Sequence, residues 1–355
     1  MPRINQKKIK MKKNLRNILA VGLGLITTVA FAQDWNVDSR TRIDQSGDND
    51  KMVTSQRATI GATWGGSDWG IHVSSDVNIT LGSPLTAAPS AVIYEAYAST
   101  DLMGYANMTA GRQALNYGSG ALISSNDWAS RRSTWDGFTF GLNLDMADVT
   151  IGYASSNDYT AAEFGVADAD VTEDQGNMHV NVGGEFSGWN VNVLYMTQTA
   201  SDDAATGLDV SGEVSGATVS GSMNTDFGGA EMRVIGLGYA VNDDMGVSVS
   251  QTVYDDENGN FTMAGTNMNG SWDVTGNLGY QVAGTEVLAY GLTYKMSGIS
   301  LGATMYNVTN DTNGTDTDAT EISLGYSLND NAGLGLSMID DNDVNYMYIT
   351  LNVGL

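Results

Sequence analysis

The chain has 355 residues, no cysteine, 43 glycines and 3 prolines, and its formal net charge is −25. The lack of cysteine excludes a disulfide scaffold, so stability must come from packing and hydrogen bonding. The acidic balance excludes a nucleic-acid-binding protein, because the chain would repel phosphates.

The first 32 residues have the pattern of a secretory signal peptide. Basic residues precede an apolar run over 18–31, and Ala30-Phe31-Ala32 forms a small-x-small cleavage site. The apolar run is too short to cross a membrane as a helix. We therefore expect cleavage after Ala32 and a mature chain, 33–355, that forms one domain. An uncleaved N-terminal membrane anchor is the alternative.

Loss of this segment makes the chain more acidic. Seven of the 16 basic residues lie in the first 32 residues, so nine remain against all 41 acidic residues and the formal charge becomes −32. High net charge can favour disorder. A regular alternation of apolar residues argues against disorder here, and no later stretch reaches the roughly 18–20 apolar residues of a membrane helix.

Along the mature chain, segments of about ten residues alternate apolar and polar side chains, as strands with two different faces do. Examples are 69–79, 138–144, 189–195, 288–296 and 322–328. The polar positions hold Gly, Ser, Thr, Asn, Asp and Gln almost throughout. Such alternation fits both a soluble β-sandwich and an outer-membrane barrel, in which the apolar face meets lipid and the polar face lines a wet lumen.

Three features favour the barrel. The segments have nearly the 9–11 residues of a tilted spanning strand. Short connections alternate with long ones, as periplasmic turns alternate with extracellular loops. Aromatic residues recur near strand ends, as in an interfacial girdle; they are Trp35, Trp64, Trp69, Trp135, Trp189, Tyr239, Trp272 and Tyr294. We therefore predict an all-β fold, a transmembrane antiparallel β-barrel in the Gram-negative outer membrane.

The connections give the number of strands. Short turns are expected at 65–68, 101–104, 145–148, 187–188, 242–246, 267–270, 297–298 and 329–333. Longer loops are expected at 45–50, 82–90, 112–133, 156–176, 199–230, 255–260, 309–319 and 340–344, with a brief one near 282–286. These connections predict 18 strands if 260–267 is a short strand. They predict 16 if that segment and a neighbour belong to a loop.

The last ten residues, "YMYITLNVGL", are expected to form the strand that closes the barrel. Met347, Ile349, Leu351, Val353 and Leu355 then face lipid, and Tyr346, Tyr348, Thr350 and Asn352 face the pore. This ending resembles the signal that the barrel-insertion machinery recognises, with Leu355 in place of the usual Phe.

No arrangement of residues predicts catalysis, so we expect a protein that is not an enzyme and holds no cofactor. His72 and His179 have no motif around them and are interpreted as lumen-facing polar residues. Two isolated histidines cannot supply the three or four ligands of a common zinc site. Acidic loops at 45–51, 255–260 and 310–321 are either solvated or bind Ca²⁺ or Mg²⁺ that bridges to lipopolysaccharide.

The few basic residues point to a constriction in the pore. Arg40, Arg42 and Arg57 fall in the polar phase of the first two strands. Arginines that face carboxylates create a transverse field that orients and selects polar solutes. Alternatively, the arginines only pair with neighbouring carboxylates. The predicted pore-lining residues are Arg40, Arg42, Arg57, Asp76, Glu95, Arg112, Arg131, Arg132 and Lys295, with further carboxylates at Asp38, Asp44, Glu185, Asp273 and Glu321.

The segment "AGRQALNYGSGALISSNDWASRRSTWDGFTFGL" resembles a pattern of the alginate-export family of outer-membrane barrels and related porin-like proteins of Bacteroidota. The matching positions are Gly111, Arg112, Gln113, Leu115, Tyr117, Gly118, Asp127, Trp128, Arg131 or Arg132, Asp136 and Gly137. The resemblance covers some 30 residues. It implies an 18-stranded barrel with an extracellular loop folded toward the pore.

The sequence as a whole predicts an outer-membrane porin, a passive diffusion channel for small hydrophilic solutes that is narrowed by loop 112–133. The alternative is a substrate-specific oligosaccharide or polysaccharide channel of the alginate-export type, although a lumen with so few basic residues suits an anionic polymer poorly. The expected partners are outer-membrane lipid, lipopolysaccharide, the insertion machinery and small polar solutes. A monomer and a homotrimer both stay open.

Overall fold

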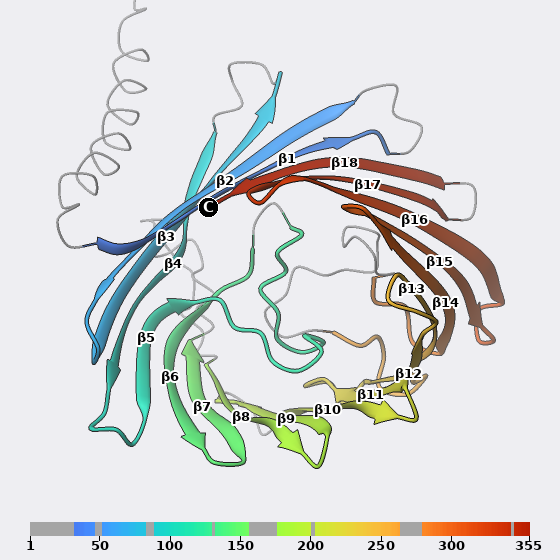
Figure 1. The fold of residues 1–355 in the computed structure, drawn as a ribbon. Helices are drawn as coiled ribbons and strands as arrows, with labels where there is room; N and C mark the ends of the chain where they lie inside the picture. Colours follow the sequence, from blue (N-terminus) through green and yellow to red (C-terminus); the bar gives the residue numbers. More distant parts are fainter. Residues whose placement is uncertain are drawn as a thin grey trace, which may run out of the picture.

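The computed structural model describes residues 32–46, 52–82, 89–129, 132–155, 176–199, 203–262, 279–341 and 344–355. In these residues the chain forms one antiparallel sheet of 18 strands that closes on itself (Figure 1). The predicted signal peptide, the turn at 267–270, Arg131 and Asp273 lie outside the described residues. No helix among the described residues is long and apolar enough to cross a lipid bilayer.

The strands follow one another around the barrel in chain order. They are β1 (Ala32–Asp44), β2 (Val53–Gly65), β3 (Trp69–Leu81), β4 (Ser90–Asp101), β5 (Asn107–Gln113), β6 (Trp135–Leu144), β7 (Ala147–Ser155), β8 (Asn177–Phe186), β9 (Trp189–Gln198), β10 (Ala204–Val214), β11 (Ala217–Thr225), β12 (Glu231–Ala240), β13 (Met245–Tyr254), β14 (Thr285–Met296), β15 (Ile299–Asn310), β16 (Thr315–Asn329), β17 (Ala332–Asp341) and β18 (Val344–Gly354).

The first and last strands close the barrel. β1 pairs with β18 from Asp38 opposite Gly354 to Asp44 opposite Tyr348. The backbone N–H of Gly354 also donates to Asn331 O, in the short turn between β16 and β17. A closed sheet leaves no strand edge exposed. The structure therefore confirms the all-β fold with 18 strands, and the end with the short connections is called the turn end below.

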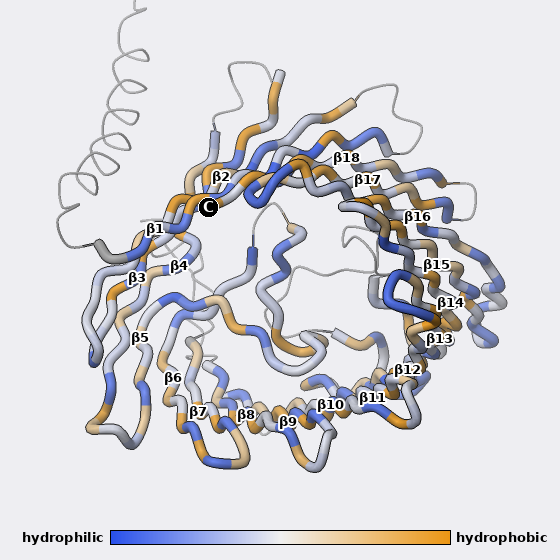
Figure 2. Tube along the Cα trace, viewed as in Figure 1, coloured by the Kyte–Doolittle hydropathy of each residue, from blue (hydrophilic) through white to orange (hydrophobic). Residues whose placement is uncertain are grey.

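Side chains alternate between the outside and the inside of the barrel, as the sequence predicts. On β16, Ile322 is 49% exposed on the outer face, whereas Glu321 is 5% exposed and faces inward. On β18, Ile349 and Val353 lie outside and Tyr348 and Thr350 are buried inside. Figure 2 shows the same alternation of apolar and polar residues along the strands. The outer face therefore presents a broad apolar surface.

Two strands occupy a segment that the sequence predicts to be a loop. Residues 199–230 contain β10 and β11, which are joined by a two-residue turn at Ser215 and Gly216. Both turn residues have a positive φ, of 54° and 82°. The strands are rich in Gly, Ala, Ser and Thr, so the alternation of large apolar residues is weak. Backbone pairing with β9 and β12 holds them in the wall.

The opposite error occurs after β13. A strand is predicted at 260–267 and a separate loop near 282–286, but β13 pairs directly with β14, from Met245 opposite Tyr294 to Val253 opposite Glu286. The wall thus has no place for a strand between them. The two errors cancel, so the predicted number of 18 strands is right although two of the predicted strands are in the wrong place. The loop predicted at 309–319 shrinks to 311–314.

The predicted aromatic girdle is only partly on the outer face. Trp35, Trp69 and Tyr239 are exposed there. Trp135 is buried inside the barrel, in the same apolar core as the loop that precedes it. The prediction that Trp135 lies at a membrane interface is therefore wrong, because Trp135 is one of the β6 residues that point into the barrel. Trp272 lies outside the described residues.

Candidate functional site

The connection between β5 and β6 folds into the barrel and crosses its interior (Figure 1). Residues 114–129 and 132–134 are described and are called the inner loop here. Its position matches the prediction that loop 112–133 narrows the lumen, with bounds shifted because Arg112 and Gln113 belong to β5. The inner loop has two anchors on different parts of the wall.

The first anchor is apolar. Ala121, Leu122 and Ile123 are almost fully buried. They belong to one core with residues of β9 and β10, such as Leu194 and Ala205. Burial of apolar side chains in contact with one another is the main stabilising term in folded proteins. This part of the lumen is therefore filled by side chains.

Polar contacts reinforce the apolar anchor. The Tyr117 hydroxyl lies 3.2 Å from His179 Nε2 on β8, and Ser119 Oγ lies 3.3 Å from Ser222 Oγ on β11. The Tyr280 hydroxyl donates to Ala121 O at 3.1 Å. Burial raises the pKa of Tyr117 to about 12, so its hydroxyl stays protonated at neutral pH.

The second anchor is built on arginines of β1 and β2. Arg40 and Arg42 are two residues apart on β1 and share its inner face, and Arg57 on β2 pairs directly with Arg40. Like charges directly opposite one another destabilise a sheet. Three neighbouring guanidinium groups inside a barrel therefore need acceptors.

The inner loop supplies those acceptors. Asp127 O accepts from Arg40 and from Arg57, both at 2.8 Å. Arg42 donates to Trp128 O at 2.9 Å, and its guanidinium lies over the Trp128 ring, 3.2 Å from the centroid. Arg57 also bonds the Asp127 carboxylate, at 3.0 Å. Asn126, with a φ of 46°, turns the chain just before these acceptors; asparagine tolerates this left-handed conformation better than most residues.

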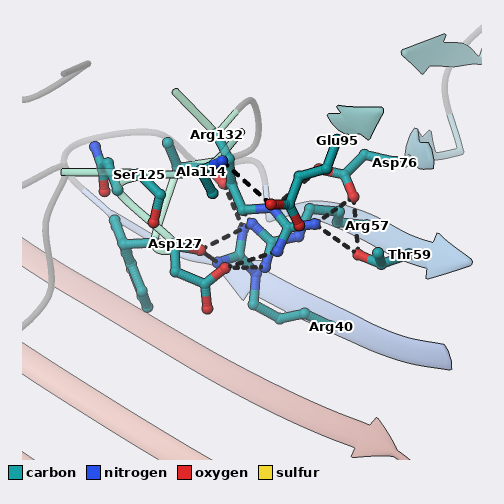
Figure 3. A network of polar contacts seen from close by, with 12 residues as sticks. Arg40, Arg57, Thr59, Asp76, Glu95, Ala114, Ser125, Asp127 and Arg132 are labelled. Carbon is teal, nitrogen blue, oxygen red and sulfur yellow. Dashed lines mark hydrogen bonds and ion pairs between the residues drawn. The ribbon is translucent and has the colours of Figure 1, made fainter. Parts of the chain in front are cut away.

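Arg132 ties the end of the inner loop to β2 and β3. Its guanidinium donates to both carboxylate oxygens of Asp76 and to Thr59 Oγ1 (Figure 3). It also lies over the Tyr94 ring, 3.4 Å from the centroid. Tyr94 reaches this point because a β-bulge leaves it unpaired in β4. We call Arg40, Arg42, Arg57, Arg132, Asp76 and Asp127 the arginine clamp.

Charge pairing shifts the ionisation of the clamp residues in the inner loop. Burial alone would raise the pKa of Asp127, but Arg57, Arg132 and Arg40 outweigh it and hold the pKa below its usual range. Burial would lower the pKa of Arg132, but its bonds to Asp76 raise it. Both residues therefore stay charged across physiological pH.

The histidines and Glu95 have structural partners. Glu95 Oε1 accepts from the backbone N–H of Ala114, at the start of the inner loop. His72 lies between Thr63 Oγ1 at 2.9 Å and Glu95 Oε2 at 3.7 Å. His72, Thr63 and Glu95 are absent from the lining of both cavities described below. Both histidines face inward, as predicted.

The structure brings together most, though not all, of the predicted constriction. Arg40, Arg42, Arg57, Asp76 and Arg132 meet in the clamp, and Glu95 lies at its edge. Arg112 forms an ion pair with Asp136 at 2.6 Å. Asp136 alternates with Phe138 and Phe140, which are exposed on the outer face, so the pair faces outward and not into the pore. Lys295 lies at the turn end of β14, five strands from β1. Arg112 and Lys295 are thus separate from the clamp.

Two cavities flank the inner loop. The larger, about 1000 Å³, lies between residues 118–128 and strands β8 to β15, and is lined by Gly, Ser, Asn and Thr with Tyr254 and Tyr306. The smaller, about 480 Å³, lies beside the clamp and the turn between β16 and β17. Asp127 lines both cavities, and its side chain is 73% exposed. The open volume is therefore mostly on the side away from the arginines.

Sequence reasoning missed the roles of Asp127, Trp128 and the apolar triplet 121–123. A signal for the triplet was present, because three apolar residues in a row are unusual in a loop rich in Gly, Ser and Asn. Nothing local shows that the backbone carbonyls of residues 127–129 accept bonds from arginines some 70 to 90 positions away. Among the described residues, no group of three or more His, Asp or Glu could hold a metal ion.

Comparison with known proteins finds similar barrels. No protein-family model matches the chain, and no curated protein matches its sequence. Pseudomonas aeruginosa OpdK with vanillate has a TM-score of 0.70 at 12% identity and covers 92% of this chain and 99% of its own. OccD3 (OpdP) of the same organism has 0.65 at 13% identity over 92% of both chains, and Acinetobacter baumannii OccAB4 has 0.65 at 14% over 90% and 97%.

These structures are OprD/Occ-type outer-membrane porins with 18-stranded barrels. At such low identity the likeness is one of fold. The resemblance to the alginate-export family receives no support from these comparisons.

Proposed function

We propose that the chain is an outer-membrane porin, a passive diffusion channel for small hydrophilic solutes. The observation that carries the proposal is a cavity of about 1000 Å³ beside an inward-folded loop, in a closed barrel with an apolar outer face. An apolar exterior with a polar interior is the arrangement of a barrel that lies in lipid and holds water. The fold of the OprD/Occ-type porins supports the same function.

The proposal places the protein in the Gram-negative outer membrane after removal of residues 1–32. Its partners there are lipid, lipopolysaccharide and, during assembly, the insertion machinery. The protein catalyses no reaction in this proposal, and solutes move through it down their concentration gradient. The inner loop sets the width of the path, and Arg40, Arg42, Arg57 and Arg132 hold that loop in place.

Planar-bilayer recording of the refolded protein tests this function. We expect stepwise conductance in KCl and swelling of proteoliposomes in small neutral sugars. The control is the same preparation after heat unfolding. Correctly folded and inserted protein without conductance steps or solute entry would contradict the proposal.

A solute-specific channel is the second candidate, because aromatic side chains line the larger cavity. Tyr254, Tyr280 and Tyr306 line it, and aromatic rings of this kind pack against sugar rings. A specific channel would show saturable block of its current by one oligosaccharide. OpdK is described with vanillate, an aromatic carboxylate. The larger cavity of this chain has no Lys or Arg in its lining, so we do not propose an aromatic acid or alginate as its solute.

A further inference from the structure

We propose that the larger cavity is the solute path and that it favours cations, with Asp209 and Glu185 as the residues that set this preference. The inference rests on the proposed porin function. It assigns the selectivity to one arc of the barrel wall and to named side chains on it.

The lining of the larger cavity carries charge of one sign. Its carboxylates are Asp127 on the inner loop, Glu185 on β8 and Asp209 on β10, and its lining includes no Lys or Arg. A path lined by carboxylates raises the local concentration of cations and lowers that of anions. The remaining lining is uncharged, with polar, aliphatic and aromatic side chains, so it adds no opposing charge.

The clamp arginines do not line this cavity, since Arg40, Arg57 and Arg132 line the smaller cavity on the other side of the inner loop. Arg42 and Arg57 are buried, and their donors reach loop carbonyls and Asp127. Arg132 is held by Asp76, on β3. The inner loop stands between these groups and the larger cavity. Only Asp127 lines the cavities on both sides of the loop.

The distribution of basic residues along the chain gives the same result. The 100 residues from 133 to 232 contain no Lys or Arg, and this stretch includes strands β6 to β11. Arg233, on β12, is exposed and pairs with Asp255 at 3.3 Å. Its side chain points outward, because the preceding residue on β12, Met232, is buried inside the barrel. Lys295 lies at the turn end of β14 and does not line the larger cavity.

Asp209 and Glu185 have no basic partner. Among the described residues no ion pair includes either of them. Asp209 Oδ1 is also buried without a hydrogen-bond partner in this part of the chain, next to Asn192 on β9. A carboxylate that is partly removed from water and lacks a protein partner is stabilised by a mobile cation. Glu185 is exposed and Asp209 is partly exposed, so both carboxylates are expected to act on cations in the cavity.

The experiment measures the reversal potential of the reconstituted full mature chain in a KCl gradient. We expect the wild type to prefer K⁺ over Cl⁻. Asp209→Asn and Glu185→Gln keep side-chain size and each should lower the permeability ratio by up to about fivefold, the effect of one unit charge about 4 Å away in water. Asp136→Asn, whose carboxylate lies on the outer phase, is the matched control and should leave the ratio unchanged.

The outcomes separate this inference from the porin proposal. An inserted protein without conductance would overturn both. Conductance with a Cl⁻ preference would overturn only the inference. A K⁺ preference that Asp209→Asn and Glu185→Gln leave unchanged, but that Arg57→Gln alters, would place selectivity at the clamp and also overturn it. Circular dichroism of each variant checks that the barrel is intact.

Discussion

Two arcs of the same barrel differ in whether their charged side chains are paired. The arc from β1 to β4 carries three of the four clamp arginines and Asp76, and their partners are Asp127, Arg132 and carbonyl oxygens of the inner loop. The arc from β8 to β13 carries the inward carboxylates Glu185 and Asp209 among Gly, Ser and Asn, and no ion pair in the described residues includes either of them. The charge that a solute meets therefore depends on which charged side chains are left unpaired, and not on the total number of charges inside the barrel.

The difference comes from what each arc packs against. The clamp arc is covered by the inner loop, so its charges are withdrawn from water and must be paired. The opposite arc borders an open cavity, where a carboxylate can be balanced by mobile ions. Buried pairs on one side hold the loop, and exposed charges on the other remain available to solutes.

The largest effect is expected from breaking the buried pair of the clamp. Arg132 and Asp76 have side chains only 9% and 1% exposed. Asp76→Asn leaves a buried guanidinium without its counter-charge, which costs about 3–5 kcal/mol. Urea unfolding in lipid vesicles, followed by tryptophan fluorescence, measures the loss. Asp136→Asn breaks a pair that is 40% and 43% exposed at the loop ends of β5 and β6, and exposed pairs of this kind contribute about 0–1 kcal/mol. Equal losses of stability in the two variants would contradict the claim that the buried Arg132–Asp76 pair stabilises the barrel more than an exposed pair does.

The second test concerns the outer face that both arcs share. Ile322 is at the middle of β16 and points outward, and its neighbour Ser323 points inward. Ile322→Arg should cost roughly 2–4 kcal/mol near the bilayer midplane. Ser323→Arg should be tolerated, because its guanidinium reaches the lumen. The same unfolding measurement applies, and a cost at Ser323 as large as at Ile322 would refute the assignment of the faces.

A smaller effect is expected where the inner loop touches the carboxylate arc. Gly118 has a φ of 56°, and a Cβ there would overlap Asp209 Oδ2. Gly120 has a φ of 78° but more space around it. Alanine at either position costs roughly 1–2 kcal/mol for the left-handed backbone, and only Gly118→Ala adds the overlap.

Cysteine trapping measures this contact, since the chain has no cysteine of its own. Cysteines introduced at Ser119 and Ser222, whose Oγ atoms are 3.3 Å apart, should form a disulfide readily on oxidation. Gly118→Ala should slow its formation more than Gly120→Ala. Equal rates would mean that the loop does not rest on Asp209.

The smallest effect is expected from pH. The pKa of Asp127 is depressed in the folded protein, so its contribution is present above the ordinary value of about 3.9 and is lost as pH falls through the lower folded value. We expect the noise of the open channel to stay constant from pH 8 to 5 and to rise only below about pH 4. Asp127→Asn should remove the rise, because no carboxylate is then left to protonate. A transition near pH 6 would contradict the role of Asp127.

Much of the fold could be predicted because it depends on local patterns. The alternation along β18 identified which side chains face inward, since side chains in a strand change face at every residue. The strand count was right for partly wrong reasons. β10 and β11 lack large apolar residues, so their place in the wall follows from pairing with neighbours, which a local pattern does not report.

The sequence by itself determined the class of fold and the facing of most side chains, because periodicity and turn residues act over a few positions. The inward fold of loop 112–133 was implied only by a resemblance to other barrels. Only the tertiary structure decided what the arginines do. Arg112 faced outward through the register of β5 and β6, and Arg57 met a backbone carbonyl 70 positions away. Such contacts join residues distant in sequence, and backbone carbonyls are the same in every residue. The sign of the charge that faces the larger cavity therefore emerges only when the barrel closes around its loop.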